Sequence, residues 1–164
     1  MPDRYFEEFE LGQRWVTRGR TVTEADVVNY SGLSADFFPL HVDREYAAQT
    51  RFGQRIAQGF LVMSFATGMV PADPEKVEAL YGIDRLRFLR PVFIGDTVHI
   101  EMEVVAKQER TDGSGVVDFK QTIVNQNGEV VIANIYRLLM RKRPTADSSQ
   151  ESVNSHQSSV NSHQ

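Results

Sequence analysis

The chain has 164 residues, of which 41% are hydrophobic and 24% charged, and this composition fits one soluble globular domain with a substantial core. Its 18 basic and 22 acidic residues give a net charge of −4, which argues against the concentrated basic surface of a nucleic-acid binder. The absence of cysteine excludes disulfides, thiolate metal ligands and cysteine nucleophiles, and it suits a reducing compartment.

Hydropathy gives no sign of membrane targeting. The first ten residues, MPDRYFEEFE, are acidic and lack an apolar stretch, so we expect no signal peptide. The longest apolar run, around Phe60 to Met63, is far too short to span a bilayer. We therefore expect a cytoplasmic protein that has neither a membrane nor a nucleic acid as its partner.

Short elements are predicted at the start of the chain. Residues 15–21 are typical of a short strand. Thr23 and Asp26 form a T-x-x-D pattern, in which the first residue caps a helix and the second bonds back to the cap. This pattern predicts a helix from Glu24 to about Ser31 that ends near Gly32.

The middle of the chain combines a loop with two helices. Residues 34–42 contain Pro39 and are predicted to form a loop, and Asp43 is predicted to cap a short helix over residues 44–49. The stretch GFLVMSFATGM, residues 59–69, is apolar nearly all round. This pattern indicates a buried helix and not a surface one.

The second half alternates at period two, which is typical of strands. Residues 97–104 place four apolar side chains on one face: Val98, Ile100, Met102 and Val104. Two further strands, 116–124 and 130–139, flank an NQNG turn, and residues 85–93 supply another strand entry. The simplest assembly is an α+β fold, in which a curved antiparallel sheet wraps around the buried helix.

Composition changes from Pro144 onward. The segment is rich in Ser, Gln and Asn and contains two copies of SVNSHQ, so it has little to bury and is predicted to be disordered. We therefore expect one domain over residues 1–143 and a disordered tail over residues 144–164. His156 and His163 lie in this tail and are discounted as catalytic candidates.

The segment SADFFPLHVD, residues 34–43, carries the most informative chemistry. Asp36 and His41 lie five residues apart among apolar side chains, where burial would raise the pKa of a carboxyl and the pair could move the proton of one water. An Asx-turn aspartate and an ordinary hydrogen-bonded histidine explain the same residues, and spacing alone favours that structural interpretation. His99 shares a strand face with acidic residues, so a catalytic imidazole would be His41. No spacing typical of metal ligands is present.

Three segments resemble one enzyme family. DFFPLHVD resembles the hydration motif of the MaoC-like dehydratases, the (R)-specific enoyl-CoA hydratases, which runs Asp, any residue, Asn, Pro, an aliphatic residue, His, any residue and an acid. RIAQGFLVMSFATGM and RFLRPVFIGDTV resemble two further segments of that family, and the likeness spans about Phe9 to Leu139. It implies a hot-dog fold, usually a homodimer with the two sheets joined edge to edge. The implied reaction is reversible addition of water to a trans-2-enoyl-CoA thioester in fatty acid metabolism, with no cofactor because CoA is part of the substrate.

The resemblance also implies roles for individual residues. Asp36 and His41 match the catalytic aspartate and histidine, and Gly59 matches the glycine whose backbone N–H meets the thioester carbonyl in an oxyanion hole. Two positions depart from the family pattern, because Phe38 replaces an Asn and Gln58 replaces a common His. Both departures leave the acyl preference open.

Two other functions compete with hydration. A hot-dog acyl-CoA thioesterase usually carries a carboxylate base on or near its central helix, but residues 59–69 contain no Asp or Glu. A non-catalytic acyl-CoA-binding module would explain Phe38, although the presence of both Asp36 and His41 counts against it. Three arginines are candidate partners of the CoA phosphates: Arg85, Arg87 and Arg90.

Overall fold

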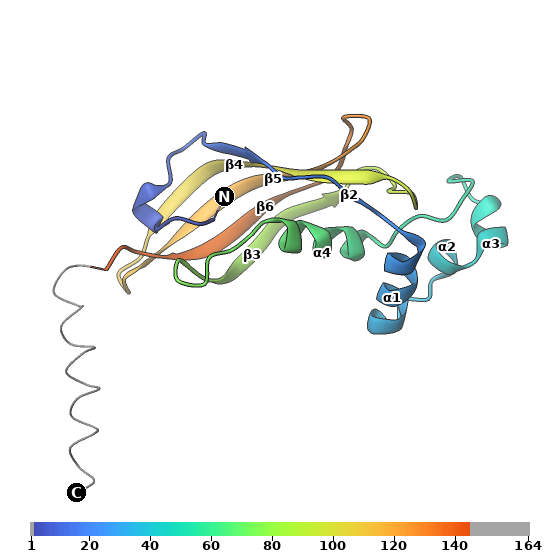
Figure 1. Ribbon diagram of the computed structural model, residues 1–164, viewed down its shortest axis with the longest axis horizontal. Helices are drawn as coiled ribbons and strands as arrows, with labels where there is room; N and C mark the ends of the chain where they lie inside the picture. The colour runs from blue at the N-terminus through green and yellow to red at the C-terminus, as the bar shows by residue number, and fades with distance from the viewer. Residues whose placement is uncertain (1, 145–164) are drawn as a thin grey trace, which may run out of the picture.

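The computed structural model describes residues 2–144, which form one curved six-stranded antiparallel sheet with helices on one face and at one end (Figure 1). The strands follow the order β1-β4-β5-β6-β3, and β2 pairs beside β1 on β4. The strands are β1 (Arg14–Val16), β2 (Arg20–Thr21), β3 (Val77–Phe88), β4 (Thr97–Glu109), β5 (Ser114–Asn125) and β6 (Val130–Arg141). The helices are the 3-10 turn η1 (Phe6–Glu8), α1 (Glu24–Ser34), α2 (Pro39–Val42), α3 (Arg44–Ala48) and α4 (Gly59–Met69).

The long strands β4, β5 and β6 form the centre of the sheet, and each buries alternate residues on one face. The predicted face of β4 is confirmed, since Val98, Ile100, Met102 and Val104 are all buried. The NQNG turn is confirmed as the β5–β6 connection, where the side-chain oxygen of Asn125 accepts hydrogen bonds from the backbone N–H groups of Asn127 and Glu129 at 3.0 Å each. These strands form the wall against which α4 packs.

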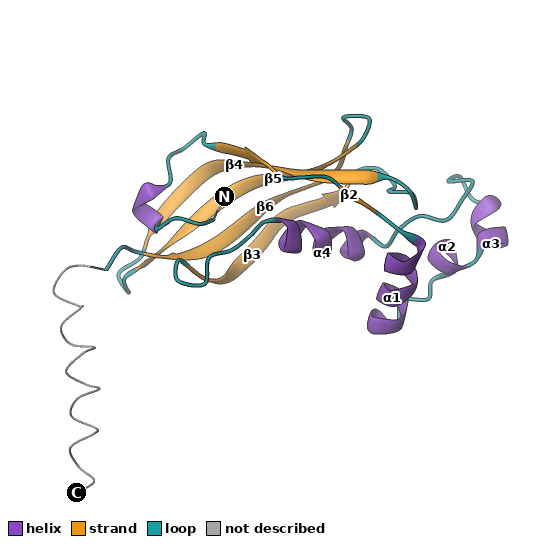
Figure 2. Ribbon diagram, viewed as in Figure 1, coloured by secondary structure: helices purple, strands orange, loops and turns teal. Residues whose placement is uncertain are grey.

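Helix α4 lies along one face of the sheet, as Figure 2 shows. It begins at Gly59 and ends at Met69, as predicted, and its buried residues are Leu61, Val62, Met63, Phe65 and Ala66. Its opposite side is open, and Phe60 is 62% exposed. The predicted helix is therefore buried on the side that faces the sheet and exposed on its other side in the single chain, because one sheet covers only one side of it.

Helices α1, α2 and α3 gather beyond one end of the sheet (Figure 1). The capping box of α1 is confirmed, since the Thr23 side chain accepts from Asp26 N–H at 3.2 Å and the Asp26 carboxylate accepts from Thr23 N–H at 2.8 Å. The predicted end near Gly32 is wrong. The helix continues to Ser34 and stops at Ala35, whose φ of 60° places it in the left-handed conformation that ends many helices.

The predicted loop over residues 34–42 is wrong in its second half. Its last four residues form α2, and Pro39 occupies the first helical position, where its missing N–H costs no hydrogen bond. The short helix after Asp43 is confirmed as α3, and the Asp43 carboxylate accepts from Tyr46 N–H at 2.9 Å. Both helices are short, and together they position residues 39–48 beside the start of α4.

Two strand predictions need correction. Residues 15–21 form two short strands, β1 and β2, and not one. Strand β3 begins at Val77, well before the predicted residue 85, and lies at the edge of the sheet, where it pairs only with β6. Its register shifts three times, the last time between Asp84 and Arg87, where Arg85 has a φ of 53°. These irregularities hide the period-two pattern that reveals the central strands.

Two further expectations from the sequence concern the predicted tail and membrane-spanning helices. Residues 145–164 of the predicted tail lie outside the described residues. No helix in residues 2–144 is long and apolar enough to cross a membrane.

Candidate active site

A pocket of about 190 Å³ lies where α2 and the start of α4 meet the end of β3. Its walls are mostly apolar and come from four parts of the chain: His41, Ile56, Ala57, Gly59, Phe60, Val62, Phe88, Arg90, Pro91, Val92 and Ile132. Apolar clefts with few polar groups are typical of small-molecule sites. In this pocket the polar side chains are those of His41 and Arg90.

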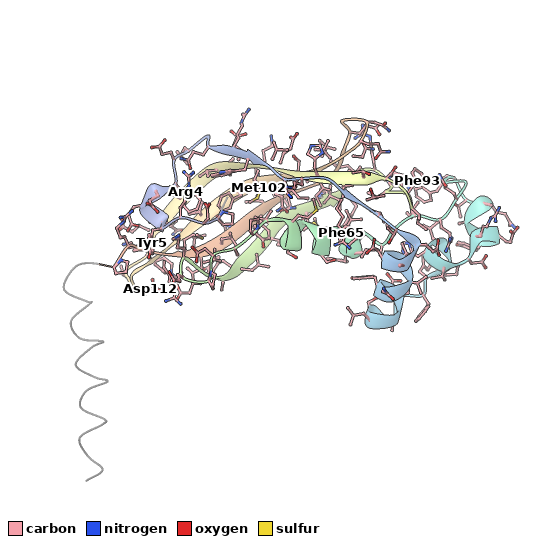
Figure 3. All side chains as sticks on the ribbon, viewed as in Figure 1. Arg4, Tyr5, Phe65, Phe93, Met102 and Asp112 are labelled. Carbon is pink, nitrogen blue, oxygen red and sulfur yellow. The ribbon has the colours of Figure 1, made fainter. Side chains whose placement is uncertain are left out.

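The labelled side chains in Figure 3 help to locate the pocket within the molecule. Phe93, whose backbone forms a bridge with Ile56, is labelled near α1, α2 and α3. Tyr5 and Asp112 are labelled at the opposite end of the sheet. The pocket therefore belongs to the helical end of the molecule.

The imidazole of His41 is oriented by a backbone carbonyl. Its Nδ1 lies 2.8 Å from the oxygen of Ile56, and the side chain is half-buried. A carbonyl only accepts hydrogen bonds, so Nδ1 carries the proton in this contact. In the neutral ring, Nε2 then holds the lone pair and can accept a proton from a water or from another donor.

Gly59 is the first residue of α4 and lines the same pocket. The first N–H groups of a helix have no intrahelical partner, and the Gln58 side chain does not cap this one. A Cβ on Gly59 would lie 2.5 Å from Cε1 of Phe88, so only glycine lets this ring approach the backbone so closely. The start of α4 thus offers unpaired donors and the positive end of a helix dipole beside an aromatic wall.

Asp36 occupies a different position from the other two predicted residues. It lies in the loop between α1 and α2, is half-buried, and is not among the residues that line the pocket. Its carboxylate accepts a hydrogen bond from Phe38 N–H at 3.3 Å, which is the local Asx contact that competes with a catalytic interpretation. The structure therefore brings His41 and Gly59 into one pocket and places Asp36 in the loop that precedes His41.

Phe38, which stands where the resembling family has Asn, packs near the catalytic candidate. Its ring centroid lies 6.1 Å from that of His41 in an edge-on arrangement, and the side chain is 53% exposed. It lies at a similar distance, 6.3 Å, from the ring of Tyr46 on α3. Phe38 thus supplies apolar cover to the His41 ring in place of a hydrogen-bonding side chain.

Gln58 connects α1 to the start of α4. Its side chain is buried, and Nε2 donates to Ser31 Oγ at 2.8 Å. Ser31 is fully buried on α1, one turn after the buried Val27. Sequence analysis missed this contact, although a polar residue at helical spacing from Val27 on the buried face was a visible signal.

Sequence analysis also missed the aromatic walls of the pocket. Phe60 and Phe88 stand edge to face with ring centroids 5.6 Å apart, and they come from α4 and the edge strand. Of the three candidate CoA arginines, only Arg90 lines the pocket, and its Nη1 donates to the oxygen of Val130 at 3.0 Å. No local pattern joins Phe88 to the start of α4, because they are far apart in sequence.

In residues 2–144, no group of three or more His, Asp or Glu side chains is placed to hold a metal ion. The polar groups that line the pocket are one imidazole, one guanidinium and the backbone.

Comparison with known proteins identifies the family. The family described as MaoC like domain matches residues 8–126 of the chain. The chain belongs to the MaoC-like domain family.

Several curated relatives of the chain are named hydratases or dehydratases. An (R)-specific enoyl-CoA hydratase from Aeromonas caviae is 35% identical over 103 residues, which cover 63% of this chain and 76% of that protein. Protein MaoC from Klebsiella aerogenes is 43% identical over 100 residues, which cover 60% of this chain. The match spans only 30% of the length of protein MaoC.

Solved structures agree on the fold. A monoamine oxidase regulatory protein from Archaeoglobus fulgius is 47% identical, with a TM-score of 0.82 over 88% of this chain and 100% of that one. A conserved hypothetical protein from Mycobacterium tuberculosis that has a double hotdog fold is 21% identical, with a TM-score of 0.77 over 87% of this chain and 46% of that one. The MaoC-like protein described here therefore has the predicted α+β hot-dog fold, in which α4 packs along one face of the curved antiparallel sheet.

Proposed function

We propose that this MaoC-like protein is an enoyl-CoA hydratase that adds water reversibly across the double bond of a trans-2-enoyl-CoA thioester. The observation that carries the proposal is the position of His41, whose Nε2 is available as an acceptor in an apolar pocket that also contains the start of α4. The hydratases and dehydratases among its relatives support the same reaction class. No cofactor is needed, because the thioester itself activates the double bond.

The proposed role of α4 is to stabilise negative charge. As the water oxygen attacks C3, electron density moves to the thioester oxygen of the enolate. The N–H of Gly59, at the positive end of α4, is the proposed donor to that oxygen. Such a donor is typically worth about 3 kcal/mol in the transition state.

Asp36 is the proposed second member of the acid–base pair. It lies in the loop that leads into α2, five residues before His41, and its carboxylate accepts a hydrogen bond from Phe38 N–H. We propose that a water is held between Asp36 and His41, that one of them removes its proton, and that a proton reaches C2 from the same face. The two groups are treated as one coupled unit because interacting titrations belong to the pair.

We further propose that the protein is a homodimer joined at β3. This edge strand leaves Leu80, Tyr81 and Phe88 each about half exposed, and exposed Phe60 of α4 lies against Phe88. Exposed edges and contiguous apolar surface favour pairing with another chain. A second copy would cover both the strand edge and the open side of α4.

The test follows the loss of enoyl-thioester absorbance with crotonyl-CoA, together with the release of free thiol. The wild-type protein is expected to consume the conjugated thioester without releasing thiol. The variants Asp36→Asn and His41→Gln are expected to lose about 10²-fold to 10⁴-fold in rate, which is the usual contribution of general acid–base groups.

Two matched variants serve as controls. His99→Gln changes a histidine on the outer face of β4, and Asp112→Asn changes an aspartate in the turn between β4 and β5, both outside the pocket lining. Both are expected to keep the wild-type rate. Thiol release would instead indicate a thioesterase, and full activity in His41→Gln would refute the proposed mechanism.

A further inference from the structure

Two amide side chains meet beneath α4, away from the residues used so far. Gln121 of β5 and Asn134 of β6 are direct neighbours across the sheet, and they are 0% and 4% exposed. Asn134 Nδ2 donates to Gln121 Oε1 at 3.0 Å and lies 3.8 Å from the sulfur of Met63. Met102, the neighbour of Gln121 on β4, is also buried, so the pair forms a polar spot within an apolar core.

Each amide keeps one polar atom without a partner. Gln121 Nε2 and Asn134 Oδ1 are buried and have no hydrogen-bond partner within residues 2–144. Exchanging nitrogen and oxygen in both amides preserves the hydrogen bond between them and again leaves one N–H group and one oxygen free. Buried polar groups in folded proteins are nearly always satisfied. A partner that satisfies both atoms must accept one hydrogen bond and donate another, as a hydroxyl group does.

The pair lies next to residues that line the pocket, although neither amide is itself part of the lining. Ile132 lines the pocket, and Asn134 follows it by two residues on the same face of β6, a step of about 7 Å. Val62 lines the pocket as well, and Met63, the next residue of α4, contacts Asn134. A ligand that passes His41 and continues between α4 and the sheet would approach the two free polar atoms.

We propose that Gln121 and Asn134 form a polar subsite that holds one hydroxyl group at the inner end of the pocket. The hydroxyl comes either from the acyl chain of the substrate or from a resident water. The first source rests on the proposed hydratase function, whereas the second does not. Both sources make the end of the pocket polar, so a plain alkyl chain that reaches it would displace or desolvate polar groups and bind less well.

The first experiment compares two substrates of equal length, trans-2-hexenoyl-CoA and 5-hydroxy-2-pentenoyl-CoA, in which a hydroxyl replaces the terminal methyl group. If the acyl chain supplies the hydroxyl, wild-type kcat/KM for the hydroxylated substrate is expected to exceed that for the alkyl substrate by about tenfold or more, since sites that bind a hydroxyl discriminate strongly against its loss. The double variant Gln121→Met, Asn134→Leu is expected to abolish or reverse this preference. The far-UV circular dichroism spectrum and thermal melting of the double variant check that it still folds.

The second experiment is a high-resolution crystal structure of the unliganded wild type and of the same double variant. A resident water is expected as one ordered peak within hydrogen-bond distance of Gln121 Nε2 and Asn134 Oδ1 in the wild type, absent from the variant. This result, together with equal kcat/KM for the two substrates, would assign the hydroxyl to water. Equal kcat/KM and no such peak would overturn the proposal. Failure of the wild type to hydrate even crotonyl-CoA would refute the proposed function, while the crystal structures would still test for the water.

Discussion

One hydrogen bond determines which nitrogen of His41 is left free as an acceptor. Because Nδ1 donates to the carbonyl of Ile56, the ring presents Nε2 as its free nitrogen. Sequence analysis selected His41 by eliminating the other histidines and by resemblance, but the tautomer depends on Ile56, which lies 15 residues away. Asp36 was selected from the same motif, and its local contact with Phe38 shows why a motif alone cannot separate a turn residue from a catalytic one.

The contact between Gly59 and Phe88 provides a residue-scale prediction. Gly59→Ala would place a methyl group 2.5 Å from the Phe88 ring, so the ring must move out of its present position in the pocket wall. We expect kcat/KM with crotonyl-CoA to fall at least tenfold, with a loss of about 1–3 kcal/mol in the free energy of unfolding. The double variant Gly59→Ala, Phe88→Ala tests the cause. If the losses caused by Gly59→Ala and Phe88→Ala simply add in the double variant, the contact with Phe88 does not explain the effect of Gly59→Ala.

Ala35 provides a second residue-scale prediction. Its φ of 60° is a conformation in which a Cβ costs about 1 kcal/mol and glycine costs little. Ala35→Gly is therefore expected to raise the free energy of unfolding by a few tenths of a kcal/mol to about 1 kcal/mol, measured by urea denaturation. Ala25→Gly, inside α1, is the control and is expected to destabilise the protein by a similar amount. Destabilisation by Ala35→Gly would contradict the assigned helix end.

At the scale of elements, the sequence predicted those helices and strands whose signals come from residues close together along the chain. Capping residues predicted the starts of α1 and α3, and period-two burial predicted the central strands β4, β5 and β6. Strand β3 could not be predicted over its full length, because its edge position exposes both faces and its register shifts remove the alternation. The pocket walls were missed for a related reason, since they join α4 to β3 and β6 through contacts that sequence spacing does not encode.

The capping box of α1 gives a pH-dependent prediction. Burial opposes ionisation of Asp26, but hydrogen bonds from the Thr23 side chain and backbone and the charge of Arg20 outweigh it, so the pKa lies below the ordinary 3.8. A lowered pKa stabilises the fold above the unfolded value, and this contribution disappears as the pH falls through the folded value. We expect Asp26→Asn to cost about 1 kcal/mol near neutral pH and progressively less below pH about 4.

Urea denaturation at several pH values measures this difference. Thr23→Ser keeps the hydroxyl and is expected to leave the pH dependence unchanged. A cost for Asp26→Asn that stays constant from neutral to acidic pH would show that the ionised carboxylate is not the stabilising form.

At the scale of the whole molecule, one sheet and one helix leave several large apolar side chains exposed. The open side of α4 and the edge strand β3 are adjacent, and the aromatic contact between Phe60 and Phe88 connects them. The resemblance to MaoC-like proteins implied a dimer joined along sheet edges, and the half-exposed side chains of β3 provide a physical reason to expect one. Sequence alone could not locate this surface, because a helix that is apolar on all sides also fits a fully buried position.

The proposed dimer gives a prediction for assembly. Leu80 on β3 is 49% exposed, and Leu80→Lys would place a charge at the proposed edge. We expect the wild type to sediment at twice the mass of the chain and the Leu80→Lys variant to sediment mainly as a monomer. Leu33→Lys, which changes a residue that is 86% exposed on α1, is the control and is expected to stay dimeric. A monomeric wild type would refute the dimer.

Phe88 belongs both to the pocket wall and to the strand proposed as the dimer edge. Two equilibria, ligand occupancy and association, therefore share one side chain. Thermodynamic linkage requires reciprocity, so if pairing of two copies orders the Phe88 ring and strengthens ligand affinity by some factor, the ligand must strengthen association by the same factor. Dilution of such a protein would dissociate the dimer and weaken its affinity for the ligand. A saturating ligand would stabilise the dimer.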